Sequence, residues 1–561
     1  MNRGLARLLA VTLPALLSAC TLEPNYHRPP SPVPALVDGS RDGVAASTIG
    51  WREFFPDPQL QRLIAVALAN NRDLRIAALN VQYAQARYRI QRANLFPTVD
   101  ASALEEVERF PPGVIGPSTS GGLPAAGTLR FYNVGIGFSS YELDFFGRIR
   151  SLNHAALEQY LSLDETRRSA QLTLVAEAAS AYVTVLADET LLAITRETLK
   201  NQNESYALTQ RMFGGGTSTE LALRQAETTV DAARANLAQY SRQLAQDRDV
   251  LQLLLGAPIP EDIDFAGGLD RGPAVAELEE GIPSDVLLRR PDVLAAEYQL
   301  RAANAQIGAA RAAFLPAITL TGSFGTASAE LSDLFKGDSR TWTFLPQVSV
   351  PIFAGGANVA NLQASRTARD TATAQYERAI QSAFREVADA LAARRTLDDQ
   401  LAAQQELMTA SAAAYRLAQM RFRGGVDSYL SALDAQRALY SAQQQLQGVR
   451  LMRLQNLVTL YKALGGGLLE RASTAPAGDQ PSSSNGSTWD SSEPEPGLSL
   501  STKVVPEPNQ RVGRLSDFDQ KGPFAAIALY TRAMGAESLL WFALQNKPGR
   551  PYVVKICSFS T

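Results

Sequence analysis

Side chains that could carry chemistry are few in this 561-residue chain. It has two histidines, His27 and His154, and two cysteines, Cys20 and Cys557. The histidines lie too far apart in sequence to suggest a site, and no Gly-x-x-x-x-Gly-Lys phosphate loop or His-Glu-x-x-His metal motif is present. The cysteines stand at opposite ends, which argues against a disulfide framework. We therefore expect a protein that is not an enzyme and holds no metal, with structural histidines.

The charge balance excludes another class of function. Lysine and arginine number 53 against 56 aspartates and glutamates, and the net charge is −3. Nucleic-acid-binding proteins usually carry a basic patch or a high pI. We expect no nucleic-acid partner.

The N-terminus predicts one covalent modification. Two arginines precede a short apolar run, residues 8–17, which is too short for a transmembrane helix. Leu17-Ser18-Ala19-Cys20 follows and resembles a bacterial lipobox, with residues 1–19 as the signal peptide and Cys20 as the lipidated first residue. Acyl chains anchor by burying CH₂ groups, at about 0.8 kcal/mol each. The covalent lipid is the only cofactor we expect. By resemblance to enteric lipoproteins, Thr rather than Asp at position 21 favours the outer membrane. The alternative is an ordinary cleaved signal with an incidental cysteine.

The chain is duplicated, and the duplication must position any site that it has. Tyr415 aligns with Tyr206, and the match continues at a constant offset. The other aligned pairs include Phe422 with Phe213, Gly424-Gly425 with Gly215-Gly216, Leu430 with Leu221, Ala435 with Ala226, and Leu464 with Leu255. An earlier stretch also repeats, with Asp73 on Asp292 and Pro97 on Pro316. Repeats of roughly 200 residues indicate a duplicated domain rather than a short-repeat solenoid. The expected domains are a signal peptide (1–19), an extended segment (20–59), repeat 1 (60–257), a linker (258–283), repeat 2 (284–467) and a C-terminal extension (468–561).

Each repeat reads as a helix, two strands and two long helices. The first helices are expected at residues 60–93 and 284–313, where apolar residues recur every three or four positions. Strand hairpins are expected at residues 98–143 and 317–352, because apolar and polar residues alternate there. Transmembrane strands of roughly 9–11 residues show this alternation. A half-buried soluble sheet alternates identically, so the pattern alone does not decide.

The second half of each repeat predicts a very long helical hairpin. Residues 151–212, 219–255, 359–422 and 426–464 contain no proline and only one glycine, Gly448. About 60 helical residues span roughly 90 Å, longer than any compact core. Glycines at 214–216 and 424–425 read as tight turns that close the two hairpins, whose apolar spacing is coiled-coil-like.

Four strands cannot enclose a wide lumen, and an open sheet edge cannot face lipid. Closure therefore demands an oligomer, and three copies give about twelve strands, enough for a water-filled barrel. The helices of three copies would continue this barrel as a hollow cylinder. The fold class is thus a mixed α/β membrane protein, a homotrimer with a twelve-stranded β-barrel continued by an α-helical barrel.

At this point the residues resemble a known family. The chain is similar to the TolC-like outer-membrane factors, in the lipoprotein branch that serves RND-type multidrug efflux. The stretches that carry the resemblance are residues 17–20 (LSAC), 51–60 (WREFFPDPQL), 71–74 (NRDL), 144–150 (DFFGRIR), 289–292 (RRPD), 351–356 (PIFAGG), 421–430 (RFRGGVDSYL) and 434–437 (DAQR). The similarity runs in order from about residue 10 to about residue 468. It implies a trimeric channel, anchored in outer-membrane lipid and extending into the periplasm, that docks a membrane-fusion adaptor and an inner-membrane RND pump.

The resemblance also implies a gate at the closed periplasmic tip. By motif match, acids and a leucine just past the turn constrict the tip, and these are Asp427, Leu430 and Asp434. Arg421 and Phe422 lie where the family often has Arg-Tyr bonds that hold the tip shut, but Phe422 lacks the hydroxyl.

Physical arguments agree in part with these gate assignments. Three copies of Asp434 around an axis form a cation-attracting ring, and three copies of Leu430 form a dewetting constriction. Asp427 has an equally good alternative role as a helix cap, a favoured place for aspartate. Since Leu221 and Gln225 are the counterparts of Leu430 and Asp434, an acidic ring would come mainly from repeat 2.

The resemblance stops near residue 467. Residues 472–510 are rich in Ser, Pro, Gly and Glu and read as a disordered linker. The rest of the extension, to residue 561, is expected to be poorly ordered, with a short helix at 536–545 as an alternative.

The leading functional hypothesis is a passive exit duct for drugs or other small molecules. A type I protein-secretion duct is the second hypothesis, against which the lipobox and the pump-associated motifs weigh. A non-channel coiled-coil scaffold of the envelope is the third, and it predicts no pore.

Overall fold

The structure, a computed structural model, describes residues 21–34, 48–110, 127–271, 275–276, 284–471, 528–534, 537–544 and 552–560. The chain divides into two compact units, Met1–Ala477 and Gly478–Thr561, which are described separately. The signal peptide, Cys20, most of the hairpin loop at 111–127 and the linker at 472–510 lie outside the described residues.

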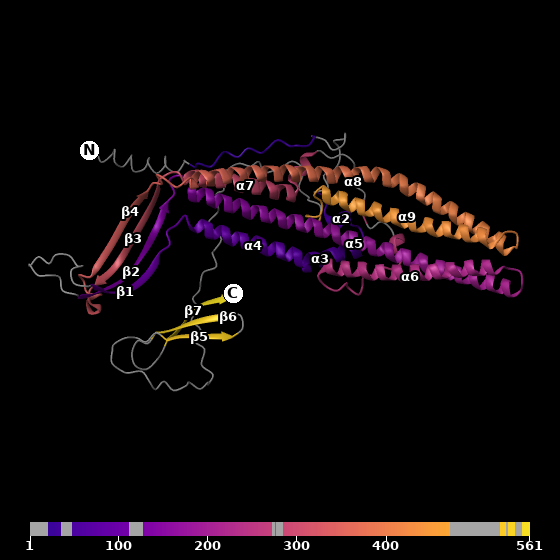
Figure 1. Ribbon diagram of the computed structural model, residues 1–561, viewed down its shortest axis with the longest axis horizontal. Helices are drawn as coiled ribbons and strands as arrows, with labels where there is room; N and C mark the ends of the chain where they lie inside the picture. The colour runs from indigo at the N-terminus through magenta and orange to yellow at the C-terminus, as the bar shows by residue number, and fades with distance from the viewer. Residues whose placement is uncertain are drawn as a thin grey trace, which may run out of the picture. The chain divides into compact units, whose positions relative to one another are not determined.

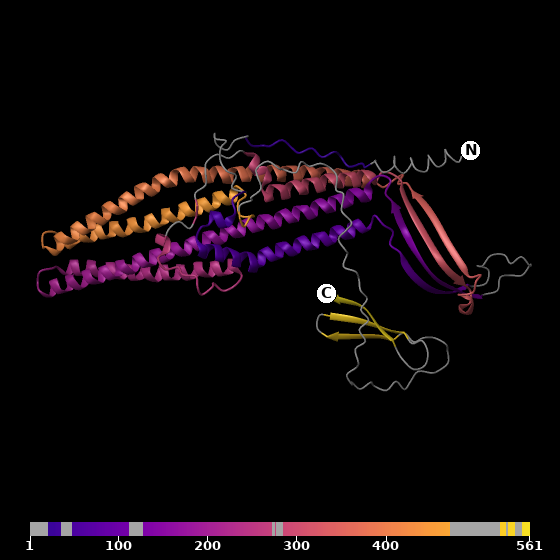
Figure 2. The same cartoon turned by 180° about the vertical axis from the view of Figure 1, so that it is seen from behind.

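A four-stranded antiparallel sheet lies at one end of the helices of the first unit (Figures 1 and 2). Its strands are β1 (Asp100–Phe110), β2 (Gly127–Leu143), β3 (Ala317–Ser328) and β4 (Arg340–Ser349), in the order β1-β2-β3-β4. The expected strand hairpins are thus confirmed, and β2 of repeat 1 pairs with β3 of repeat 2. A short 3₁₀ helix, η4 (Leu331–Asp333), lies between β3 and β4.

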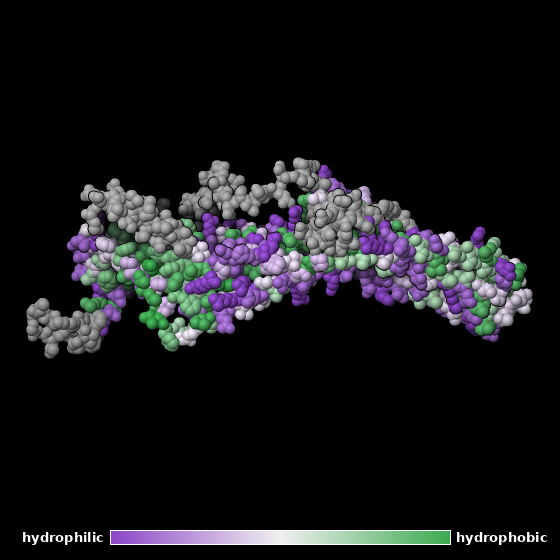
Figure 3. Space-filling view, turned by 90° about the horizontal axis from the view of Figure 1, so that it is seen from above, coloured by the Kyte–Doolittle hydropathy of each residue, from purple (hydrophilic) through white to green (hydrophobic). Residues whose placement is uncertain are grey.

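The register of the sheet separates an apolar face from a polar one. Ile136 pairs with Phe324, and Phe324 pairs with Trp342. Side chains of alternate strand residues point to opposite faces, so these three lie on one face. Trp342 is 73% exposed and Phe324 59% exposed. Apolar side chains gather over the strands in Figure 3. A sheet face this apolar and this exposed requires a covering environment that the described residues of one chain do not supply.

Two helical hairpins extend away from the sheet, as expected from the sequence. In repeat 1 they are α5 (Arg148–Gly214, 67 residues) and α6 (Glu220–Leu255, 36 residues). In repeat 2 they are α8 (Ala357–Arg423, 67 residues) and α9 (Tyr429–Ala463, 35 residues). At 1.5 Å per residue, α5 and α8 each span about 100 Å. Among the described residues only α5 is long and apolar enough to pass for a membrane span, but 61% of that stretch is buried, as in core helices of soluble proteins.

The first helix of each repeat is broken, and the expectation of one continuous helix at 60–93 is wrong. Helices α3 (Pro58–Asn70) and α4 (Arg72–Ala93) meet at Asn71, whose ψ of 132° is not helical. Its side chain accepts a hydrogen bond from the Leu74 amide at 2.9 Å and donates to the Leu254 carbonyl at 2.9 Å. These tertiary and capping bonds outweigh the helical periodicity on either side.

Repeat 2 breaks at the equivalent position. There η3 (Ser284–Arg289) precedes α7 (Pro291–Ala312), and the break falls at Arg290, the residue before a proline, which disfavours helical backbone. The buried Arg290 guanidinium donates to the Ala463 carbonyl at 2.9 Å and pairs with Asp292 and Glu386 at 2.8 Å. The RRPD motif therefore joins α7, α8 and α9.

The aromatic core lies where the start of the chain meets its repeats. In α2 (Trp51–Phe54), Phe54 stacks on Tyr461 of α9 with ring centroids 3.9 Å apart. The Trp51 amide donates to the Leu469 carbonyl at 2.9 Å, and the Tyr182 hydroxyl donates to Asp57 at 2.7 Å. The WREFFPDPQL stretch thus fastens both ends of the duplicated unit together.

Residues 21–34 run along α5 and α7 as an extended strap. Arg28 of this strap pairs with Glu297 of α7, which is 2% exposed, at 2.6 Å. His154 of α5 lies between Glu23 of the strap and Glu158, at 3.0 and 3.1 Å. Hydrogen bonds to Glu158 and Glu23 raise the pKa of His154 to about 10, so its imidazolium is charged at neutral pH. His154 is therefore structural, as expected.

The second unit holds a three-stranded antiparallel sheet. Its strands are β5 (Ala528–Met534), β6 (Glu537–Leu544) and β7 (Tyr552–Ser560), in that order. The structure differs here from the expected poor order, and it has a strand in place of the alternative helix at 536–545. The Tyr, Val, Ile, Trp and Phe content of these segments favours strands.

Candidate gate at the two helical hairpin turns

The turns that close the two long hairpins have the same backbone. In each, one amide just after the helix bonds a carbonyl four residues back and another a carbonyl five residues back. The bonds are Gly215 to Arg211 (3.0 Å) and Thr217 to Met212 (2.8 Å) in repeat 1, and Gly424 to Met420 (2.9 Å) and Val426 to Arg421 (3.0 Å) in repeat 2. Gly216 and Gly425 have φ values of 74° and 71°, a left-handed conformation that glycine adopts without steric cost. The duplicated glycines therefore build one turn twice.

An ion pair within the turn distinguishes repeat 2. The Arg421 guanidinium donates two hydrogen bonds to Asp427, Nε to Oδ2 at 2.6 Å and Nη2 to Oδ1 at 2.9 Å. The hydrogen bonds from Arg421 hold the pKa of the Asp427 carboxyl below its usual value. Helix α9 has Ser428 as its N-cap, without a side-chain cap bond, so the alternative role of Asp427 as a helix cap is not found.

Phe422 makes a ring contact in place of the hydrogen bond that it cannot donate. It packs edge-on against Tyr429, with ring centroids 5.4 Å apart. Tyr429 and Leu433 are buried against Ala226 of α6, and Tyr206 of α5 packs on the same cluster. Burial raises the pKa of the Tyr429 phenol. The cluster joins the two hairpins near their turns, and sequence reasoning missed its central residues, Tyr429 and Leu433.

Leu430 and Asp434 lie together on the opposite, exposed face of α9. They are four residues apart and therefore one above the other on the helix. Leu430 is 48% exposed, and Asp434 is exposed too. The structure thus brings Arg421 to Asp427 and Phe422 to Tyr429, and leaves Leu430 and Asp434 on a free apolar and acidic face.

The equivalent positions of repeat 1 carry different chemistry. Met212 and Ser218 stand where repeat 2 has the Arg421–Asp427 pair, and Gln225 stands where it has Asp434. The helix α6 is capped by Thr219, whose hydroxyl accepts from the Ala222 amide at 3.2 Å. The exposed leucine is kept, as Leu221 at 68% exposure, and so is the phenylalanine, as Phe213.

Cys20, the expected lipidation site, lies outside the described residues, but the residues that follow it are placed. The Leu22 carbonyl accepts a hydrogen bond from Arg311 at 3.1 Å, and the Pro24 carbonyl accepts from Asn304 at 2.7 Å. Both donors belong to α7, which leads directly into β3. The residues after Cys20 therefore dock beside the junction between helices and sheet.

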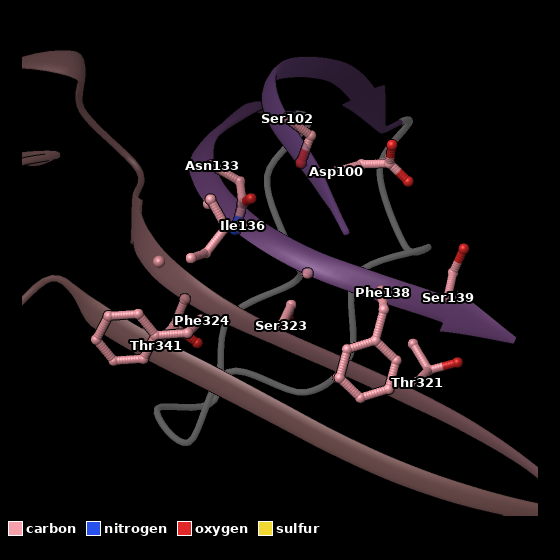
Figure 4. A pocket seen from close by; sticks show the side chains of 14 residues that line it. Asp100, Ser102, Asn133, Ile136, Phe138, Ser139, Thr321, Ser323, Phe324 and Thr341 are labelled. Carbon is pink, nitrogen blue, oxygen red and sulfur yellow. The ribbon is translucent and has the colours of Figure 1, made fainter. Parts of the chain in front are cut away.

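A cavity of about 230 Å³ lies at the sheet and is lined by polar side chains as well as by Ile136, Phe138 and Phe324 (Figure 4). Its polar lining comes from all four strands: Asp100, Ser102, Asn133, Ser139, Thr321, Ser323 and Thr341. Hydroxyl, amide and carboxyl groups are suited to contact with water. One face of the sheet is thus polar where the other is apolar, as in strands between lipid and a lumen.

Comparisons with known proteins match both repeats. The sequence model of a family described as "Outer membrane efflux protein" matches residues 63–257 and 282–466. The probable efflux pump outer membrane protein TtgC of Pseudomonas putida is 48% identical over 474 residues, which cover 83% of this chain and 96% of that protein. The outer membrane protein OprJ of Pseudomonas aeruginosa is 43% identical over 470 residues, covering 82% and 95%.

Solved structures show the same fold. The open state of the MtrE outer membrane channel of Neisseria gonorrhoeae has a TM-score of 0.73 and 40% identity, covering 80% of this chain and 100% of that chain. A membrane protein from Pseudomonas aeruginosa has a TM-score of 0.74 and 43% identity, covering 80% and 98%.

Proposed function

The chain belongs to the outer membrane efflux protein family, and we propose that it is the passive exit duct of a tripartite efflux system. The observation that carries the proposal is the division of its four-stranded sheet into an apolar and a polar face, at one end of helices about 100 Å long. Strands of this kind span a membrane, and helices of this length reach far beyond it.

The duct is a homotrimer in this proposal. Strands β1 and β4 are the two ends of the sheet order, so each leaves one edge without a partner strand among the described residues. Such an edge cannot face lipid, and pairing β1 of one copy with β4 of the next closes a barrel of about twelve strands. Helix α4 also exposes an apolar stripe that a neighbouring copy would cover: Ile76, Leu79, Tyr83 and Ile90.

The names of relatives support a proposal for the cargo. Their names include a toluene efflux pump outer membrane protein and an antibiotic efflux pump outer membrane protein, both of Pseudomonas putida. We propose that this chain exports small molecules of these classes, solvents and antibiotics. In this scheme a periplasmic membrane-fusion adaptor and an inner-membrane RND pump deliver them to its tip.

The gate of this duct is formed by repeat 2. Leu430 and Asp434 share the exposed face of α9. Three copies of each around the axis make a leucine constriction beside an acidic ring, which excludes water and discourages anions. Arg421 and Phe422 hold the turn and the start of α9 in place, through Asp427 and Tyr429.

Conductance across planar lipid bilayers tests the duct. The purified full-length protein and an Asp434→Ala variant are inserted separately, with boiled protein as the control. We expect small, cation-selective currents from the wild type and larger, less selective currents from the variant. If neither preparation conducts although both are trimeric, the protein is not a channel, and the scaffold hypothesis replaces this one.

The lipid anchor is tested separately, through metabolic labelling with palmitate. We propose that Cys20 is acylated, because it ends a lipobox and because the residues after it dock beside the sheet. Cys20→Ser is expected to abolish the label and to leave the trimer folded. Cys557→Ser is the matched control and should keep the label. Equal labelling of the wild type and Cys20→Ser would refute the lipobox.

A further inference from the structure

A buried carboxyl group in α5 faces a second carboxyl group in α6. Asp188 is 2% exposed, and its Oδ1 accepts a hydrogen bond from Gln243 of α6 at 2.8 Å. Asp247 lies one helical turn after Gln243, hence on the same face of α6, and interacts with Asp188. The other oxygen of Asp188, Oδ2, is buried and has no donor among the described residues. Two ionised carboxylates can only accept hydrogen bonds, so this arrangement is satisfied only if one of them carries a proton.

The charges around the pair do not supply a cation to it. Glu189, next to Asp188 in the chain, forms an ion pair with the nearby Arg248 of α6 at 2.5 Å. Arg248 also lies over the ring of Phe265, at 5.3 Å from its centroid. The groups that face Asp188 are therefore Asp247 and Gln243 from α6 and Glu189 from its own helix, none of them positive.

Repeat 2 lacks the pair at the equivalent place. Leu397 of α8 stands for Asp188 and is buried, and Asn456 of α9 stands for Asp247 and donates to the Ala390 carbonyl at 2.9 Å. Glu189 and its counterpart Asp398 each pair with an arginine of the second helix, Arg248 at 2.5 Å and Arg453 at 2.6 Å, although the two arginines stand at different positions of the repeat. An apolar side chain therefore fits at the position of Asp188 between the two helices. The two acids of repeat 1 are not needed for the helices to pack.

We propose that Asp188 and Asp247 share one proton and form a pH-sensitive clasp between α5 and α6. In the closed clasp the protonated carboxyl donates its O–H to the carboxylate of its partner, while Gln243 holds Asp188 from the other side. When the shared proton leaves to solvent, two adjacent carboxylates remain, and their repulsion loosens the hairpin of repeat 1 alone. This inference concerns the packing of one chain and stands independently of the proposed function.

The pH range of the clasp follows from the burial of Asp188. Burial first, and the neighbouring Asp247 second, raise the pKa of Asp188 to about 7 from an ordinary value of 3.8. Because the folded pKa lies above the unfolded one, the folded state binds more protons between the two values. The stabilisation is therefore complete in acid, declines as pH rises and is lost above about pH 7.

Hydrogen exchange followed by mass spectrometry tests the clasp in the full-length trimer. Exchange is compared at about pH 5 and about pH 8, after correction for the intrinsic pH dependence of amide exchange. In the wild type we expect local opening of α5 and α6 near the pair to increase at least about tenfold at the higher pH, since one proton is linked to opening. The equivalent segments of α8 and α9 are an internal control and should not respond.

Variants separate the clasp from general effects of pH. Asp188→Asn supplies a permanent donor to Asp247, so it should keep α5 and α6 protected at both pH values. Asp247→Asn should act in the same way if the first variant fails to assemble. Asp398→Asn is the matched control in repeat 2 and should retain the wild-type response of repeat 1.

Infrared spectroscopy identifies the proton itself. The wild type should show the carbonyl stretch of a protonated carboxyl at about pH 6, and Asp188→Asn should lack it. The proposal is overturned if wild-type protection of α5 and α6 does not change with pH, or if the band is equal in both proteins. Loss of protection on adding a chelator would also overturn it, because a divalent cation and not a proton would then join the carboxylates.

Discussion

The two hairpin turns have the same backbone conformation but different side chains. Both turns place a left-handed glycine after a long helix and repeat the same two amide–carbonyl bonds. Repeat 2 adds the Arg421–Asp427 pair, the buried Tyr429 and the exposed Asp434, where repeat 1 has Met212, Ser218, Glu220 and Gln225. The duplication has thus kept the geometry of the turn and changed its chemistry.

This difference shows how a duplicated chain can divide two tasks. A tube wall needs six similar hairpins from three chains, and both repeats supply them. A constriction needs only one ring of side chains, and in the proposed gate the acid of that ring is Asp434 of repeat 2. The asymmetry therefore indicates function where the symmetry indicates architecture.

The largest expected effect comes from removing the free face of α9. We expect Leu430→Ala combined with Asp434→Ala to raise the bilayer conductance several-fold and to weaken cation selectivity, because both the dewetting ring and the acidic ring are lost. Leu221→Ala with Gln225→Ala is the matched change in repeat 1 and should alter conductance little. Equal effects of the two double variants would erase the functional distinction between the turns.

A smaller effect is expected at the contact between the hairpins. Tyr429→Ala removes a buried ring from its contacts with Phe422 and Ala226, at a cost of about 3 kcal/mol to local stability. Hydrogen exchange of the first turns of α9 measures this cost. Its counterpart Glu220→Ala, which removes an exposed side chain, should leave α6 unchanged. Comparable losses in both would mean that the turns are held together by the backbone alone.

The smallest effect is expected from the exposed ion pair. Asp427→Asn should increase exchange around Gly425 slightly, and high salt should reduce the difference, because exposed pairs are screened. The pKa of Asp427 is lowered in the folded chain, so its contribution is present above the ordinary aspartate value and is lost as pH falls through the lower, folded one.

A transplant sharpens the same comparison. Met212→Arg with Ser218→Asp should create the ion pair in repeat 1, since the backbone of the two turns is equal. The expected result is a salt-sensitive gain of protection around Gly216. If protection does not change, the pair depends on something other than turn geometry.

The sequence predicts elements that depend on local pattern and misses partners that depend on tertiary contacts. The absence of Gly and Pro predicted α5 and α8 to within a few residues, and alternation predicted the strands. The break at Asn71 was missed, because its hydrogen bond to Leu254 joins residues far apart in the chain. Tyr429 was missed for the same reason, since its neighbour Ala226 belongs to the other repeat.

The ion pair at the turn had a sequence signal that was available. Arg421 and Asp427 lie on either side of two glycines, and a tight turn at these glycines would bring them together. Their charges are opposite. The clasp of Asp188 and Asp247 had none, because a single acid in each of two long helices is indistinguishable from a solvated residue until the register of the hairpin is known.

The open edges of β1 and β4 have a consequence for cells that carry two versions of this gene. If three chains must close one barrel, the two edge strands of each chain pair with edge strands of its two neighbours. A chain with a damaged β4 edge but an intact β1 edge would still recruit a normal partner and then block closure. Such an allele should be dominant. When both versions are made equally, only about one trimer in eight would contain three normal chains.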